Sequence, residues 1–156
     1  EMRACVVCYR QKSYNLALLF GRVRFLRIFM GLDITVHSAL LGTAPQACPE
    51  DMAQVAQAGF ASVMVNRPDF EGGADQPTAQ AVEAAARAQG LHFYHLPSSG
   101  ADLSPSLALQ FAQMLGDAPK PILLYCRTGT RSTMIVRMAL ELGFLNPDDL
   151  SFVARA

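Results

Sequence analysis

One short segment of this chain places a cysteine and an arginine between an apolar stretch and a helix-like stretch. Cys126 directly follows the apolar residues 121–125, and Arg131 directly precedes the helical pattern of residues 132–142. A loop that leads into the N-terminus of a helix aims backbone N–H groups and the helix dipole at one point, where an anion binds. The same field lowers the pKa of a cysteine from about 8.5 toward roughly 3.5–7.5. We therefore predict that Cys126 is a nucleophilic thiolate at neutral pH.

The other residues of this loop suit the binding of a small anion. Gly129 permits a positive φ or a close approach of the backbone, and the planar guanidinium of Arg131 matches two oxygens of a tetrahedral anion. Ser132 is a candidate to cap the helix or to donate a hydrogen bond to the sulfur. Substrate contacts are also expected from the remaining loop residues, which are Arg127, Thr128 and Thr130. An inert cysteine at the end of a buried strand is the alternative, but the order of strand, cysteine, glycine, arginine and helix favours the anion loop.

The length of the loop favours the binding of a small anion. Four residues separate Cys126 from Arg131, whereas cysteine phosphatases place five between the equivalent pair. The segment from Tyr125 to Ser132 resembles the active-site loop of rhodanese-type sulfurtransferases, whose cysteine carries a sulfane sulfur as a persulfide. Cysteine phosphatases usually have a histidine just before the cysteine, where this chain has Tyr125. Outside the loop, however, the chain does not resemble a rhodanese.

Strand-like and helix-like stretches alternate from Met30 onward and must position this loop. The expected extended or strand segments are 32–41, 60–65, 91–96 and 121–125, and the expected helices are 49–58, 77–89, 104–115 and 132–142, with another starting at 146. Such alternation implies an α/β fold, with a mainly parallel sheet flanked by helices on both faces. Ligands bind such sheets beyond the carboxyl ends of the strands, and the loop of Cys126 lies at one of these ends.

A second polar segment follows the expected strand 60–65 and should share this edge of the sheet. In this segment Arg67 is a candidate to bind substrate oxygens, and Asp69 is a candidate to orient an arginine or to donate a proton. Turn formation alone also accounts for asparagine, proline and aspartate after a strand. The sequence leaves both interpretations open.

Several motifs together resemble the phosphatase-like domain of the beta-lactamase-hydrolase-like proteins. The resemblance runs from about Leu32 to the C-terminus and is carried by Cys48–Met52, Ala58–Phe60, Val65–Asp69, Gln76–Pro77, Phe93–Pro97 and Tyr125–Ser132. It implies the fold of the dual-specificity and tyrosine phosphatases. Members of the family are described both as phosphatase-like hydrolases and as sulfurtransferases, so the resemblance leaves the chemistry open.

The resemblance also suggests a general acid. Asp102 lies in the loop between Pro97 and Ser104, where dual-specificity phosphatases keep the acid that protonates the leaving oxygen. An acidic residue just ahead of a helix is equally explained by the helix dipole. Asp102 is therefore a candidate catalytic residue with a structural alternative.

Composition and charge restrict the domain organisation and the partners. A chain of 156 residues with 51% hydrophobic and 17% charged residues is expected to form one domain with a substantial core. We assign residues 30–156 to the catalytic domain and residues 1–29 to a basic extension outside the fold. From Met30 onward seven basic residues face twelve acidic ones, which gives no reason to expect a nucleic-acid partner.

The sequence also favours a cytoplasmic protein without a cofactor. Four cysteines do not make a disulfide framework in a chain of this length, and no apolar run is long enough to span a bilayer. Apolar residues between Leu16 and Met30 fall near the helical spacing of a membrane-surface helix, but a loosely attached extension is the preferred interpretation of residues 1–29. Three scattered histidines predict no metal site.

Three functions remain at this point. The favoured one is transfer of sulfane sulfur from thiosulfate or a persulfide, through a Cys126 persulfide, to a thiol such as glutathione. The alternative is a phosphatase-like hydrolase that cleaves phosphomonoesters through a Cys126 phosphocysteine. The third is a non-catalytic module that binds a small anion. The short loop and the uncertain acid at Asp102 favour sulfur, because sulfite leaves without a proton.

Overall fold

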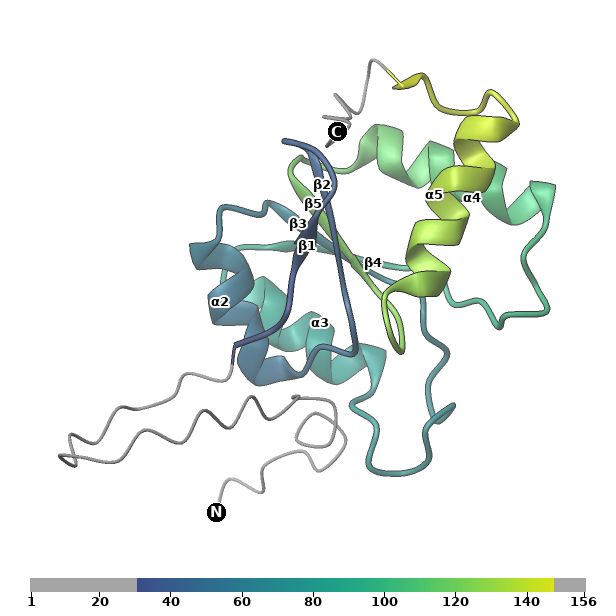
Figure 1. The fold of residues 1–156 in the computed structure, drawn as a ribbon. Coiled ribbons are helices and arrows are strands. Elements are labelled where there is room, and N and C mark those ends of the chain that lie inside the picture. Colours follow the sequence, from purple (N-terminus) through teal and green to yellow (C-terminus); the bar gives the residue numbers. More distant parts are fainter. Residues whose placement is uncertain (1–30, 148–156) are drawn as a thin grey trace, which may run out of the picture.

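The computed structural model describes residues 31–147, which form a five-stranded sheet with helices on both faces (Figure 1). The strand order is β1-β2-β5-β3-β4. Four strands run parallel, and β1 pairs antiparallel with β2 at one edge. The strands are β1 (Thr35–Val36), β2 (Leu41–Ala44), β3 (Ser62–Val65), β4 (His92–His95) and β5 (Ile122–Tyr125). The predicted α/β class with a mainly parallel sheet is therefore confirmed.

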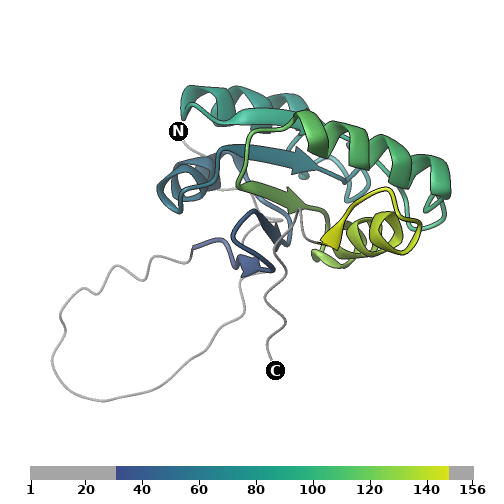
Figure 2. The same ribbon diagram turned by 90° about the horizontal axis from the view of Figure 1, so that it is seen from above.

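The helices cover the sheet in two pairs. A 3₁₀ turn (η1, Pro49–Asp51) leads into α2 (Met52–Gln57), which shares one face of the sheet with α3 (Ala79–Ala88). On the other face α4 (Pro105–Asp117) and α5 (Thr130–Glu141) lie side by side (Figure 2). Thr78 caps α3 and Ser104 caps α4 with their side-chain oxygens, so the polar residues ahead of these helices satisfy their first N–H groups.

The central strand β5 is buried on both faces and fixes the start of the active-site loop. Ile122 and Leu124 pack into the core under α4 and α5, whereas Leu123 and Tyr125 pack into the core under α2 and α3. This alternation follows from the period of two in a strand. A continuous apolar run is typical of a parallel strand that has helices above and below it, and the strand delivers Cys126 to the carboxyl edge.

Two predicted boundaries differ from the structure. The segment 32–41 is not one extended stretch, because a turn separates β1 from β2 and the backbone N–H groups of His37 and Ser38 both donate to Leu41 O. The helix expected from residue 132 begins at Thr130, with Gly129 as its N-cap. The proposed extension over residues 1–29 and most of the helix expected from 146 lie outside the described residues.

Candidate active site

The loop from Cys126 to Gly129 leaves the middle of the sheet and is held at both sides by the neighbouring strands. Asn66, which follows β3, donates its backbone N–H to Tyr125 O over 2.9 Å. Gln46, which follows β2, donates its backbone N–H to Arg127 O over 3.2 Å. The loop is thus anchored where three parallel strands end, which is the edge predicted for ligand binding.

The sulfur of Cys126 lies inside a set of backbone donors. The side chain is buried, and the N–H of Gly129 points at Sγ from 3.2 Å. Burial alone would raise the pKa of the Cys126 thiol, but the backbone N–H groups of Ser132, Thr128 and Gly129 and the Ser132 hydroxyl lower it. The net pKa lies below the usual value for a thiol, so the loop stabilises the thiolate.

Ser132 contributes to this stabilisation from the first turn of α5 and does not cap the helix. It is fully buried, and its hydroxyl lies within reach of two acceptors, Asn66 Oδ1 at 2.9 Å and the Cys126 sulfur. The single hydroxyl proton serves one of them at a time, and donation to the sulfur favours the thiolate. Asn66 in turn donates through Nδ2 to Leu96 O over 3.2 Å. Asn66 therefore links the ends of β3 and β4 to α5, the helix that follows the loop.

Ser132→Ala is expected to raise the pKa of the Cys126 thiol, because a hydrogen bond that favours the charged sulfur is lost. The rate of alkylation by iodoacetamide, followed against pH, should then rise at a higher pH than in the wild type. Below that midpoint the variant reacts more slowly, and at alkaline pH the two rates meet. Thr133→Val is the control, because it also removes a hydroxyl from the first turns of α5. The Thr133 hydroxyl donates to Gly129 O and not to the sulfur, so this variant should keep the wild-type midpoint. An unshifted midpoint in Ser132→Ala would contradict the assignment.

Gly129 is required at the turn from the loop into α5. Its φ is +90°, and a Cβ at this position would lie 3.3 Å from Ala44 O. Gly59 has the same φ of +90° but has no atom within 4 Å of such a Cβ. Both glycines therefore adopt a left-handed backbone conformation, but only at Gly129 would a side chain also press against a neighbouring atom.

Gly129→Ala and Gly59→Ala are each expected to lose about 1–2 kcal/mol of unfolding free energy, which is the cost of a left-handed conformation in a residue with a Cβ. Only Gly129→Ala should also lose activity, because relief of the contact with Ala44 O moves the loop. Chemical denaturation and turnover measured on both variants check this. Full activity in Gly129→Ala would show that the loop tolerates the displacement.

Arg131 stands in the first turn of α5 and is held by two acceptors. Its Nη1 donates to Asn66 O over 3.3 Å, and its Nη2 donates to Glu71 Oε1 over 2.7 Å. A guanidinium has five N–H groups. Within residues 31–147, these are the two acceptors of Arg131, so Nε–H and one N–H on each terminal nitrogen remain for the oxygens of a substrate.

In the structure, Arg67 and Asp69 form hydrogen bonds with other residues of the chain. Arg67 is buried and donates through Nε to Glu71 Oε2 over 2.7 Å and through Nη1 to Gln46 Oε1 over 2.8 Å. Asp69 Oδ1 accepts from the N–H of Ala79 over 2.7 Å, at the start of α3. Both residues follow β3, as predicted, but their contacts anchor the loop between β3 and α3.

Asp102 lies beside the site in an exposed turn. Its Oδ2 accepts from the backbone N–H of Ser99 over 3.0 Å and from the Ser99 hydroxyl over 2.5 Å. The side-chain and then the backbone hydrogen bond from Ser99, together with the charge of Arg131, lower the pKa of Asp102. In this arrangement Asp102 is an ionised carboxylate, so donating a proton would require it to leave Ser99.

The remaining loop residues lie toward solvent. Arg127, Thr128 and Thr130 are exposed, and the Thr128 hydroxyl donates to the Thr130 hydroxyl over 3.1 Å. Sequence reasoning missed the two residues that connect Arg67 to the loop, Gln46 and Glu71. Neither stands in a catalytic motif, and only the folded chain shows their contacts.

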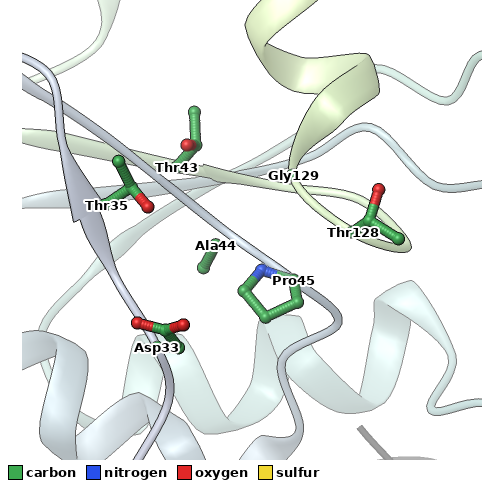
Figure 3. A pocket seen from close by; sticks show the side chains of 7 residues that line it. All are labelled: Asp33, Thr35, Thr43, Ala44, Pro45, Thr128 and Gly129. Carbon is green, nitrogen blue, oxygen red and sulfur yellow. The ribbon is translucent and has the colours of Figure 1, made fainter.

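A pocket of about 340 Å³ borders the loop on the side of β1 and β2 (Figure 3). Asp33 and Thr35 come from the segment that enters β1, Thr43, Ala44 and Pro45 from the end of β2, and Thr128 and Gly129 from the loop. The lining offers hydroxyl groups and one carboxylate. A polar group attached to the reacting anion would fit its chemistry.

In the described part of the chain, no group of three or more histidine, cysteine or acidic side chains is arranged to hold a metal ion. The helices of residues 31–147 are all too short or too polar to cross a bilayer.

Residues 33–142 match the sequence model of the phosphatase-like domain of beta-lactamase hydrolase-like protein. A beta-lactamase hydrolase-like protein of Xylella fastidiosa (strain Temecula1) is 28% identical over 108 residues, which cover 69% of this chain and 24% of that protein. The chain therefore spans about a quarter of the length of this curated relative.

The chain is similar to several solved structures, among them one from Neisseria meningitidis and one from P. aeruginosa. A candidate phosphatase of Neisseria meningitidis is 30% identical, with a TM-score of 0.58 over 70% of this chain and 87% of that one. P. aeruginosa TpbA, solved in complex with phosphotyrosine, is 15% identical, with a TM-score of 0.52 over 80% of this chain and 86% of that one. The second likeness concerns the fold alone.

Proposed function

The chain belongs to the family of the phosphatase-like domain of beta-lactamase hydrolase-like proteins, and from this premise we propose that it is a cysteine-dependent hydrolase of phosphomonoesters. The observation that carries the proposal is the sulfur of Cys126 inside converging backbone donors, with Arg131 on the first turn of the following helix. A nucleophile and a set of donors for a tetrahedral anion then share one loop.

In the proposed reaction the Cys126 thiolate attacks phosphorus. The S–P bond forms as the P–O bond to the leaving group breaks, and the leaving oxygen departs with the electron pair. Water then attacks the phosphocysteine, so that an O–P bond forms as the S–P bond breaks. Inorganic phosphate is released, the Cys126 thiolate is restored, and the proton lost by the water balances the charge of the departed oxyanion. The backbone N–H groups of the loop and the free N–H groups of Arg131 stabilise the charge on the non-bridging oxygens.

The sequence favoured sulfane-sulfur transfer, and this preference is not supported by the family match or by the solved structures described above. They favour the phosphatase-like alternative instead. Thiosulfate and glutathione as partners are likewise unsupported by these relatives. Although only four residues separate Cys126 from Arg131, three backbone N–H groups still act on the sulfur, so the short loop retains a set of donors.

A parallel assay tests the proposal. Hydrolysis of an aryl phosphate and transfer of sulfur from thiosulfate to glutathione are measured on the same preparation, with Cys126→Ser as the blank. Aryl phosphate hydrolysis above the blank supports the proposal. Turnover confined to thiosulfate would replace it with sulfur transfer, and phosphate binding without turnover in either assay would indicate an anion-binding module.

A further inference from the structure

Three residues outside the active-site loop connect Arg127 in the loop to Arg131 in the first turn of α5. Gln46 donates its backbone N–H to Arg127 O over 3.2 Å, and its Oε1 accepts from Arg67 Nη1 over 2.8 Å. Arg67 Nε donates to Glu71 Oε2 over 2.7 Å, and Glu71 Oε1 accepts from Arg131 Nη2 over 2.7 Å. We refer to Gln46, Arg67 and Glu71 as the belt. The belt lies in the segments that follow β2 and β3, beside the loop.

The ion pairs that link the belt to Arg131 run from a buried guanidinium, Arg67, to a partly exposed carboxylate, Glu71. The side chains of Arg67, Glu71 and Arg131 are 5%, 27% and 14% exposed. Burial raises the pKa of Glu71, but the hydrogen bonds and charges of Arg67 and Arg131 lower it by more. The net pKa lies below its usual value, so the carboxylate stays ionised. One carboxylate thus separates two guanidinium groups that would otherwise repel each other across the site.

The segment that carries Glu71 is itself fixed. Gln76 accepts from the N–H of Gly72 over 2.8 Å and donates to Pro68 O over 2.7 Å. A Cβ on Gly72 would lie 2.7 Å from Arg67 Nη2, so glycine lets the segment close tightly over the buried guanidinium. The hydrogen bonds of Gln76 therefore fix the segment that places Glu71 beside Arg131.

We propose that Glu71 is a positioning residue for the reaction, which holds the guanidinium of Arg131 in register with Cys126 by tying it to the buried Arg67. With Nη2 on Glu71 and Nη1 on Asn66 O, both terminal nitrogens are fixed while Nε–H and one N–H on each remain for the substrate. The inference rests on the proposed function, because Arg131 acts through a bound phosphoryl group. In this arrangement Arg67 serves as the anchor of the belt.

Glu71→Gln is expected to lower kcat/KM for an aryl phosphate roughly 10- to 100-fold, because small misplacements of a catalytic group cost about this much. The amide cannot accept from both arginines as the carboxylate does. Glu83→Gln is the matched control, because Glu83 pairs with Arg87 on the exposed side of α3. This control should keep wild-type kinetics.

A second measurement separates positioning from folding. Glu71→Gln added to Arg131→Lys should lower kcat/KM by less than about threefold beyond Arg131→Lys alone, because two changes that act through one group do not add. Additive losses would mean that Glu71 supports the fold, and would overturn the proposal. If Glu71→Gln does not fold, Glu71→Asp replaces it. This variant keeps the charge beside Arg67, and its shorter side chain should reach only one arginine.

A third measurement needs no turnover. Inorganic phosphate that occupies the loop should protect Cys126 from iodoacetamide, and half-protection in Glu71→Gln should need roughly tenfold more phosphate than in the wild type. The alkylation rate without phosphate should stay within about twofold, since Glu71 does not contact the sulfur. If the wild type shows no hydrolysis, the proposed function fails while this readout still tests the belt. Equal protection in both proteins would overturn the role of Glu71.

Discussion

Cys126→Ser is expected to abolish the hydrolysis of an aryl phosphate, with a fall in kcat of roughly 10⁴- to 10⁶-fold, as for other enzymes that lose their nucleophile. The donors around Sγ lower the pKa of the Cys126 thiol and so favour the thiolate. An alcohol ionises far less readily, so the same donors do not turn serine into a comparable nucleophile. Steady-state kinetics over a wide range of enzyme concentration measure the loss.

The fold and the anion site should survive this substitution. Serine is close to cysteine in size, so the buried position after β5 accepts it with little strain, and the backbone donors of the loop stay in place. The variant should therefore keep the thermal unfolding midpoint within a few degrees and should still bind inorganic phosphate, as seen by calorimetry. Substantial turnover in a correctly folded variant would remove Cys126 from the reaction.

The framework of the fold could be predicted because its signals are local. The run from Ile122 to Tyr125 is continuously apolar, and such a run is typical of a central strand of a parallel sheet covered on both sides. Ser104 and Pro105 mark the start of α4 through a hydrogen bond and ring geometry within a few residues of the chain. These elements lie within a few residues of their predicted positions.

The start of α5 was misplaced because two residue types competed for the cap. Ser132 has the side chain of a typical N-cap, but Gly129 adopts the left-handed conformation and Thr130 already begins the helix. The shift has a chemical consequence. Arg131 and Ser132 stand in the first turn, so the hydroxyl of Ser132 reaches the thiol and the guanidinium of Arg131 reaches the end of β3.

The partners of the site residues could not be predicted, because they are distant in sequence and have no motif. Arg67 finds Gln46 across 21 positions, and Arg131 finds Glu71 across 60. The segment from Asp69 to Gln76 has neither helical nor strand periodicity, so nothing in it singles out Glu71. Only the order β2-β5-β3 in the sheet brings these side chains to the same loop.

The length of the loop alone also does not distinguish sulfur transfer from phosphoryl transfer. Counting residues from Cys126 to Arg131 estimates the size of the ring, but donor direction decides which anion it binds. In the folded loop the N–H groups of Thr128, Gly129 and Ser132 act on the sulfur, and Gly129 allows this convergence in a short loop through its φ of +90°. A short ring is thus compatible with either chemistry.

Arg131→Lys is expected to lower kcat/KM roughly 10²- to 10³-fold, which is the usual cost of losing a preorganised donor to a developing anion. An ammonium keeps the charge but lacks the planar fork that holds Glu71, Asn66 O and a substrate oxygen at the same time. Its three N–H groups radiate from one nitrogen, whereas Arg131 reaches Asn66 O and Glu71 from two different nitrogens. The salt bridge with Glu71 is partly exposed, so the loss of stability should be small, about 1 kcal/mol or less.

Arg137→Lys is the control for this prediction, because it makes the same change on the same helix at a side chain that is 72% exposed and 3.6 Å from Glu141. It should leave kinetics and stability unchanged. Comparison of the two variants by kinetics and by chemical denaturation then separates the loss of the fork from any general effect of lysine on α5. If Arg131→Lys keeps wild-type kcat/KM, positive charge alone is enough, and the orientation that the belt gives to the guanidinium has no part in catalysis.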